Sequence, residues 1–221
     1  MIRALVFVIA CGTAFSQDIM PTGKTITELW NFYRQPSYTL LTNIILSIDV
    51  DPNFRTDKEA QTTLMAFFAV AIERYPEKFN SLNALSDSLK NVKKLLREAL
   101  ALSRKKDAIL NWRVHKPVTI GVLWSGYFAS GEPRYLKRLI SEMSLCDRND
   151  SIVVTETGFG AKLTLSMYAR MFPEIKQYLE EALGSSSANL SPHIHDAIYL
   201  SPRQIAERMK ERAEGYKSRE K

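Results

Sequence analysis

The sequence predicts an all-α protein of antiparallel helical hairpins, arranged as a bundle or a short α-solenoid-like array. Apolar residues recur every three or four positions from Thr25 onward, which is the spacing of an amphipathic helix. Prolines end several of these segments, because proline cannot continue a helix. Pro36 and Pro76 are about 40 residues apart, as are Pro133 and Pro173, and this period is typical of two-helix repeats. A plain bundle whose helices end at prolines explains the same pattern.

Four helical segments are expected in the first half, at 25–36, 37–49, 56–76 and 81–107. Thr56 is a suitable N-cap for the third segment, and Asp57 and Glu59 favour its positive end. The regular spacing of leucines in the fourth segment predicts one continuous helix. The apolar stripes comprise Ile26, Leu29, Trp30, Tyr33, Leu40, Leu41, Ile44, Ile45, Ile48, Leu64, Phe67, Phe68, Ala71, Ile72, Tyr75, Leu82, Leu85, Leu89, Val92, Leu96, Ala99 and Leu100.

The second half repeats this organisation. A helix is expected over 118–129, where Gly131 can end it in a left-handed conformation, and Pro133 suits the first turn of the next helix. Two further helices meet near Pro173. Residues 184–196 are expected to form a loop by composition, and residues 152–154 could be a short extended piece. The tail, 201–221, is expected to be a charged helix with one narrow apolar stripe.

The N-terminus, MIRALVFVIACGTAFSQD, has the layout of a secretory signal peptide. Arg3 supplies a positive charge, an apolar run follows, and cleavage after Ser16 would leave a helical domain at 17–200 and the tail helix at 201–221. An alternative is a bacterial lipobox in which Cys11 is lipidated and retained. Either outcome leaves Cys146 as the single free thiol, so no disulfide framework is expected. The predicted location is the periplasm or the exterior.

The central stretch LWSGYFASGEPRYLKRLI, residues 123–140, gathers the aromatic residues Trp124, Tyr127, Phe128 and Tyr135 around two glycines. Large aromatic side chains beside a flexible glycine suit the packed corner between two helices. The same four residues are the candidates for an aromatic groove that binds a ligand or peptide.

This stretch resembles a family of uncharacterised, exported all-helical bacterial proteins with the pattern LW-x-x-FFATG-(D/E)-x-x-Y-(V/L). The matching residues are Leu123, Trp124, Tyr127, Phe128, Ala129, Ser130, Gly131, Glu132, Tyr135 and Leu136. The stretches ELWNFYRQPS and AKLTLSMYARMFPEIKQYLE are similar to other segments of that family, with Leu163 in place of its tryptophan and Phe172 in place of its histidine. The resemblance implies an exported helical protein and no particular activity.

His193 and His195 are the weak candidates for metal ligands. In an extended segment they would share a face, and Asp196 or His115 could add a third ligand. That reading gives the alternative function, a metal-dependent hydrolase acting on envelope material. No motif for a cofactor or for a nucleophilic hydrolase is present, so none is expected.

The charge of the chain does not indicate a nucleic-acid-binding protein. Thirty Lys and Arg against 24 Asp and Glu give a net charge of +6, which is modest for 221 residues and accompanies no nucleic-acid motif. Basic runs at 93–94 and 104–106 predict solvated helix faces or contact with an anionic membrane or polymer. We therefore expect a non-catalytic interaction module of the cell envelope whose partner is a protein, a peptide or an envelope component. A structural role in a larger assembly, through the tail helix, is a further alternative.

Overall fold

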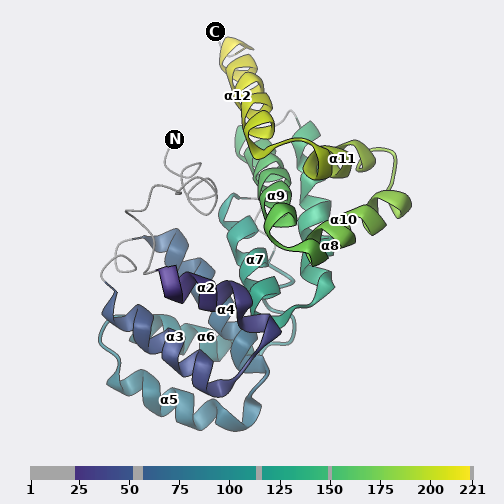
Figure 1. Ribbon diagram of the computed structural model, residues 1–221. Coiled ribbons are helices and arrows are strands. Elements are labelled where there is room, and N and C mark those ends of the chain that lie inside the picture. The colour runs from purple at the N-terminus through teal and green to yellow at the C-terminus, as the bar shows by residue number, and fades with distance from the viewer. Residues whose placement is uncertain (1–22, 52–56, 113–115, 149–150, 220–221) are drawn as a thin grey trace. The chain divides into compact units, whose positions relative to one another are not determined.

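The computed structural model describes residues 23–51, 57–112, 116–148 and 151–219 (Figure 1). Helices account for almost all of this structure, and the described residues contain no strand, which confirms the all-α prediction. Within these ranges, no helical segment combines the length and the unbroken hydrophobicity that a bilayer span needs. The predicted signal peptide, the cleavage position after Ser16 and Cys11 lie outside the described residues.

The chain divides into two compact units. Of the described residues, those within 23–112 and 121–135 form the N-terminal unit, and those within 116–120 and 136–219 form the C-terminal unit. Two helices, α7 (Val118–Ser130) and α8 (Pro133–Glu142), each contribute residues to both units.

The N-terminal unit contains hairpins of short helices whose apolar stripes face inward as predicted. In it, α4 (Lys58–Glu73) packs against α6 (Lys93–Ser103), α6 against α5 (Phe79–Ser88), and α2 (Gly23–Asn31) against α3 (Tyr38–Val50). The α3 stripe is almost fully buried, and the ring of Phe32 meets that of Phe67 edge to face at 5.4 Å. The elements before α7 are α2 (Gly23–Asn31), η1 (Phe32–Arg34), α3 (Tyr38–Val50), α4 (Lys58–Glu73), η3 (Pro76–Lys78), α5 (Phe79–Ser88) and α6 (Lys93–Ser103).

Polar side chains fix the starts of two of these helices. The Ser37 hydroxyl accepts a hydrogen bond from the Leu40 amide at 3.0 Å and caps α3. The N-cap of α4 is Asp57, whose carboxylate accepts from the amides of Glu59 and Ala60 at 2.9 and 3.1 Å. The cap is therefore one residue later than Thr56, the predicted cap, which lies outside the described residues.

The prediction of one continuous helix over 81–107 is wrong, because the chain breaks between α5 and α6. Asp49, a buried residue of α3, causes the break. Its carboxylate accepts hydrogen bonds from the backbone amides of Lys90, Asn91 and Val92 at 3.2, 2.7 and 2.9 Å. These three amides belong to the turn that leads into α6, and a carboxylate beside this turn also lies near the positive end of the helix. Asp49 thus caps the turn that leads into α6 from a distant part of the chain.

The corner after α7 has the predicted geometry. Gly131 has a φ of +74° and donates its amide to the Tyr127 carbonyl at 2.6 Å, which ends the helix in the left-handed conformation that glycine adopts without strain. The Arg74 guanidinium donates to the Ser130 carbonyl at 3.1 Å. The arginine that follows α4 therefore satisfies a carbonyl at the end of α7.

The C-terminal unit is organised around α9 (Ile152–Met171). Among the elements packed against this helix are η4 (Met143–Asp147), α10 (Pro173–Ser185), α11 (Ser191–Tyr199) and α12 (Pro202–Arg219). Ile205 and Met209 of the tail helix are buried in a cluster with Cys146, Phe159 and Leu163. The tail helix therefore docks through a narrow apolar stripe, as its spacing predicts.

Two local predictions fail in this unit. Residues 152–154 are the first turn of α9 and not an extended piece, because they continue directly into the apolar helical pattern. Residues 191–196 are helical and not part of a loop. Pro192 occupies the first turn of α11, where its missing amide costs nothing and its fixed φ favours the helix.

Candidate functional site

The four aromatic candidates of the central stretch lie in the core of the N-terminal unit. Trp124, Tyr127 and Phe128 are each 4% exposed and Tyr135 is 2% exposed. The rings of Trp124 and Phe128 stack at 5.6 Å, and Tyr127 meets Phe128 edge to face at 5.5 Å. The ring of Tyr135 lies against Gly126, where a Cβ atom would be 2.3 Å from it. The structure thus gives these side chains a packing role and leaves them no open face.

The two histidine candidates do not come together. Because 191–199 is a helix, residues two positions apart are rotated by about 200° and face different ways, so the shared face expected of an extended segment is lost. His193 is buried, with Nε2 2.9 Å from Asp147 Oδ2, whereas the ring of His195 lies against Tyr199. No three potential metal-ligating side chains converge among the described residues, and His115 lies outside them.

Other charged clusters connect helices within each unit. In the C-terminal unit, buried Lys162 of α9 pairs with Asp196 of α11 at 3.1 Å, and Asp196 also pairs with Arg208 of α12 at 2.8 Å. Burial raises the pKa of the neighbouring Cys146 thiol to about 12, so this thiol is unreactive at neutral pH. These groups hold helices in place and leave no open site.

A similar cluster surrounds Arg134 in the N-terminal unit. Its guanidinium pairs with both Glu132 and Asp107. Burial raises the pKa of nearby Glu73, and the charge of Asp107 adds to this effect. Asp107 has a φ of +57°, an uncommon conformation for a residue with a side chain. The cluster pins the chain after α6 to the start of α8.

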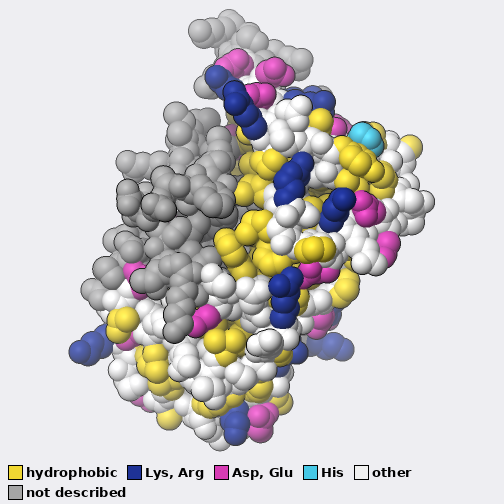
Figure 2. Space-filling model, in the orientation of Figure 1, with side chains coloured by type: hydrophobic (Ala, Val, Ile, Leu, Met, Phe, Trp, Pro, Cys, Tyr) yellow, Lys and Arg dark blue, Asp and Glu magenta, His cyan; other side chains and the backbone are white. Residues whose placement is uncertain are grey.

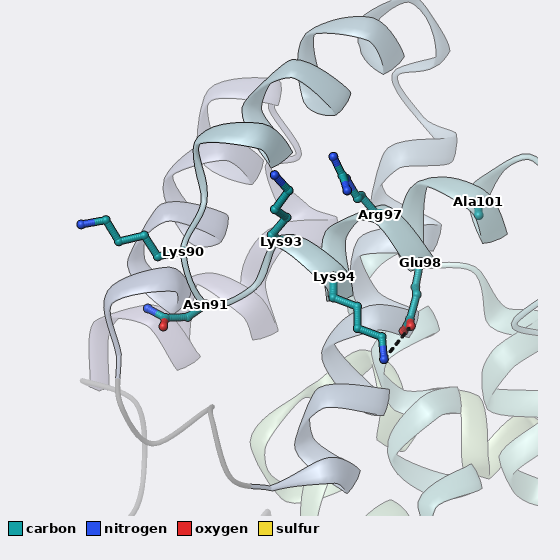
Figure 3. A pocket seen from close by; sticks show the side chains of 7 residues that line it. All are labelled: Lys90, Asn91, Lys93, Lys94, Arg97, Glu98 and Ala101. Carbon is teal, nitrogen blue, oxygen red and sulfur yellow. Dashed lines mark ion pairs between the residues drawn. The ribbon is translucent and has the colours of Figure 1, made fainter.

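The open candidate site is a hollow of about 480 Å³ beside α6, which we call the α6 groove (Figure 3). Lys90 and Asn91 lie at one end of it and Ala101 at the other, with the charged residues of α6 between them (Figure 3). Its lining residues are Lys90, Asn91, Lys93, Lys94, Arg97, Glu98 and Ala101. Lys90 and Asn91 belong to the turn that Asp49 holds before Lys93, so they lie outside the helical register of α6.

Positive charge predominates in the α6 groove. Arg97 and Lys93 both pair with Asp87, at 2.5 and 3.4 Å, and the hydrogen bond from Arg97 is the main cause of the lowered pKa of this carboxyl. Lys94 lies 3.9 Å from Glu98. Four cations and two carboxylates thus lie within or beside the groove. Elsewhere on the visible surface, Lys and Arg are scattered among other side chains without forming a continuous basic face (Figure 2).

The sequence identified only part of this site. The pair Lys93–Lys94 is visible as a basic run, whereas Lys90 and Asn91 were hidden in a predicted helix. The short polar residues Ser86, Asp87, Ser88 and Asn91 were the available signal, since such side chains compete with helical hydrogen bonds and favour turns.

Comparison with known proteins gives no relative: no family model, no curated protein and no solved structure matches the chain. The α6 groove must therefore be interpreted from its own chemistry.

Proposed function

We propose that this protein is an exported, non-catalytic binding module of the cell envelope, and that the α6 groove holds an anionic envelope component. The observation that carries the proposal is the set of four cations, Lys90, Lys93, Lys94 and Arg97, along an open hollow. Ammonium and guanidinium groups donate strong hydrogen bonds to phosphate and carboxylate oxygens. The carboxylates present are engaged by these cations, and an incoming anion would compete with Asp87 and Glu98 for them.

Removal of two groove charges should weaken the binding of a soluble polyanion. We expect Lys90→Gln/Lys94→Gln to lower the affinity for long-chain inorganic polyphosphate about fivefold to tenfold, since an exposed ion pair contributes up to about 1 kcal/mol. Isothermal titration calorimetry at low and high salt is the measurement, because added salt screens exposed charges and should weaken binding.

The matched control is Lys137→Gln/Lys176→Gln, which removes the same charge elsewhere. Lys176 pairs with Glu180 as Lys94 pairs with Glu98, one helical turn apart, so the loss of a local ion pair is similar. Equal weakening by both variants would mean that net charge, and not the groove, attracts the polyanion.

Export rests on the N-terminal pattern of Arg3 and the apolar run after it, together with the resemblance of residues 123–136 to exported proteins. Cell fractionation with N-terminal sequencing tests it. We expect an envelope or extracellular protein whose mature chain begins at Gln17. A chain that begins at a lipidated Cys11 would change the mode of attachment, and an uncleaved cytoplasmic chain would contradict export.

A further inference from the structure

Two aliphatic side chains are exposed on α3. Val50 is 74% exposed, more than any other large hydrophobic side chain that the structure describes, and Leu46 is 46% exposed. They are four residues apart in a helix, so they lie on one face, one turn from each other. The opposite side of α3 is buried, as Leu41, Ile45 and Ile48 show. This helix therefore has an apolar edge that the N-terminal unit does not cover.

The apolar edge adjoins the α6 groove. Asp49, the residue before Val50, accepts hydrogen bonds from the amides of Lys90 and Asn91, and Asn91 Nδ2 donates to the Asp49 carbonyl oxygen. Lys90 and Asn91 form one end of the groove (Figure 3). The last turn of α3, with Val50, thus lies directly beside this cationic end.

Aliphatic side chains next to cations suit one class of anionic partner in particular. A soluble polyanion would bind the cations but would make no favourable contact with the exposed Leu and Val side chains. Both kinds of side chain would strengthen binding to an anionic membrane. Its headgroups attract Lys and Arg, and aliphatic side chains enter the boundary between headgroups and acyl chains. With few cations and two aliphatic side chains, such attachment would be weak and reversible.

We infer that the partner of the α6 groove is an anionic membrane surface, and that Leu46 and Val50 enter its headgroup region while Lys90 and Lys94 contact the lipid phosphates. This inference rests on the proposed function of the groove and adds the source of the anion and a second set of contacts.

The test compares vesicles with a soluble polyanion. The full chain is mixed with vesicles of phosphatidylglycerol and phosphatidylcholine, with vesicles of phosphatidylcholine alone, or with polyphosphate, and binding is measured by flotation and calorimetry. Leu46→Gln/Val50→Gln should lower the affinity for phosphatidylglycerol vesicles about tenfold, through lost apolar contact, and leave polyphosphate binding unchanged. Lys90→Gln/Lys94→Gln should weaken binding to both. Glutamine keeps helix propensity, and circular dichroism melts verify that each variant is folded.

The control for apolar surface is Val153→Gln/Met171→Gln, since these two large apolar side chains are also exposed, at 41% and 44%, but belong to the C-terminal unit. This control variant should bind vesicles as the unmodified protein does.

If Leu46→Gln/Val50→Gln also binds vesicles as the unmodified protein does, while polyphosphate still binds at the groove, the membrane inference is overturned and the proposed function stands. If the lysine variant retains full affinity for polyphosphate, the proposed function itself fails. Equal binding to phosphatidylcholine vesicles would overturn the electrostatic part of the inference.

Discussion

Gly158→Ala should destabilise the protein by about 3 kcal/mol or more, the upper range for overpacking. An added Cβ at Gly158 would lie 2.4 Å from the backbone nitrogen of Cys146 and 2.7 Å from the carbonyl carbon of Leu145. Both atoms belong to the backbone of η4, so no side-chain rotation can relieve the overlap, and α9 must move away from η4. Thermal unfolding should show a melting temperature lower by roughly 6–12 °C, given about 2–4 °C per kcal/mol for a chain of this size.

Gly184→Ala is the matched control, because it adds the same methyl group to a helix of the same unit. A Cβ there would meet nothing within 4 Å. Alanine is the better helix former, so the variant should be as stable as the unmodified protein or more stable, by up to about 1 kcal/mol. If both variants melted alike, the close approach of α9 to η4 would be wrong.

Asp49→Ala should cost about 3 kcal/mol in the free energy of unfolding, because it leaves three amides of the turn before α6 without their acceptor. Asp49→Asn should cost less, since one amide oxygen can still accept from Asn91 and Val92. Urea denaturation measures both values. Hydrogen exchange adds a local readout, and the amides of Asn91 and Val92 should exchange faster in Asp49→Ala.

Asp87→Ala is the comparison for a carboxylate on the surface. Asp87 pairs with Lys93 and Arg97 through solvent-exposed contacts, which contribute little to stability. If Asp49→Ala were no more destabilising than Asp87→Ala, the buried cap would not hold the turn before α6.

The fold class could be predicted because it depends on local information. Periodic apolar residues identify helices, Pro36 and Pro173 stop them through covalent geometry, and Gly131 supplies a backbone conformation that other residues avoid. These effects act within a few residues, so they can be read directly from the chain.

The break between α5 and α6 could not be predicted in the same way. Its cause is Asp49, which is 41 residues from Lys90 in the chain and becomes a cap only after α3 has packed. The separation of His193 and His195 was missed because the polar composition of 184–196 indicated a loop, whereas residues 191–199 form a helix that packs against α9. Of the candidate site, the sequence therefore showed the basic run but not the groove.

The internal cap has a consequence for selectivity. Because Asp49 already accepts from the amides of Lys90, Asn91 and Val92, the turn at this end of the groove offers an incoming anion long, flexible side chains and not a rigid array of peptide N–H groups. Binding by flexible side chains discriminates poorly between anions of different shape, and each bound anion exchanges rapidly. Lasting attachment would then require avidity from a repeating array of charges, which an isolated small anion does not offer.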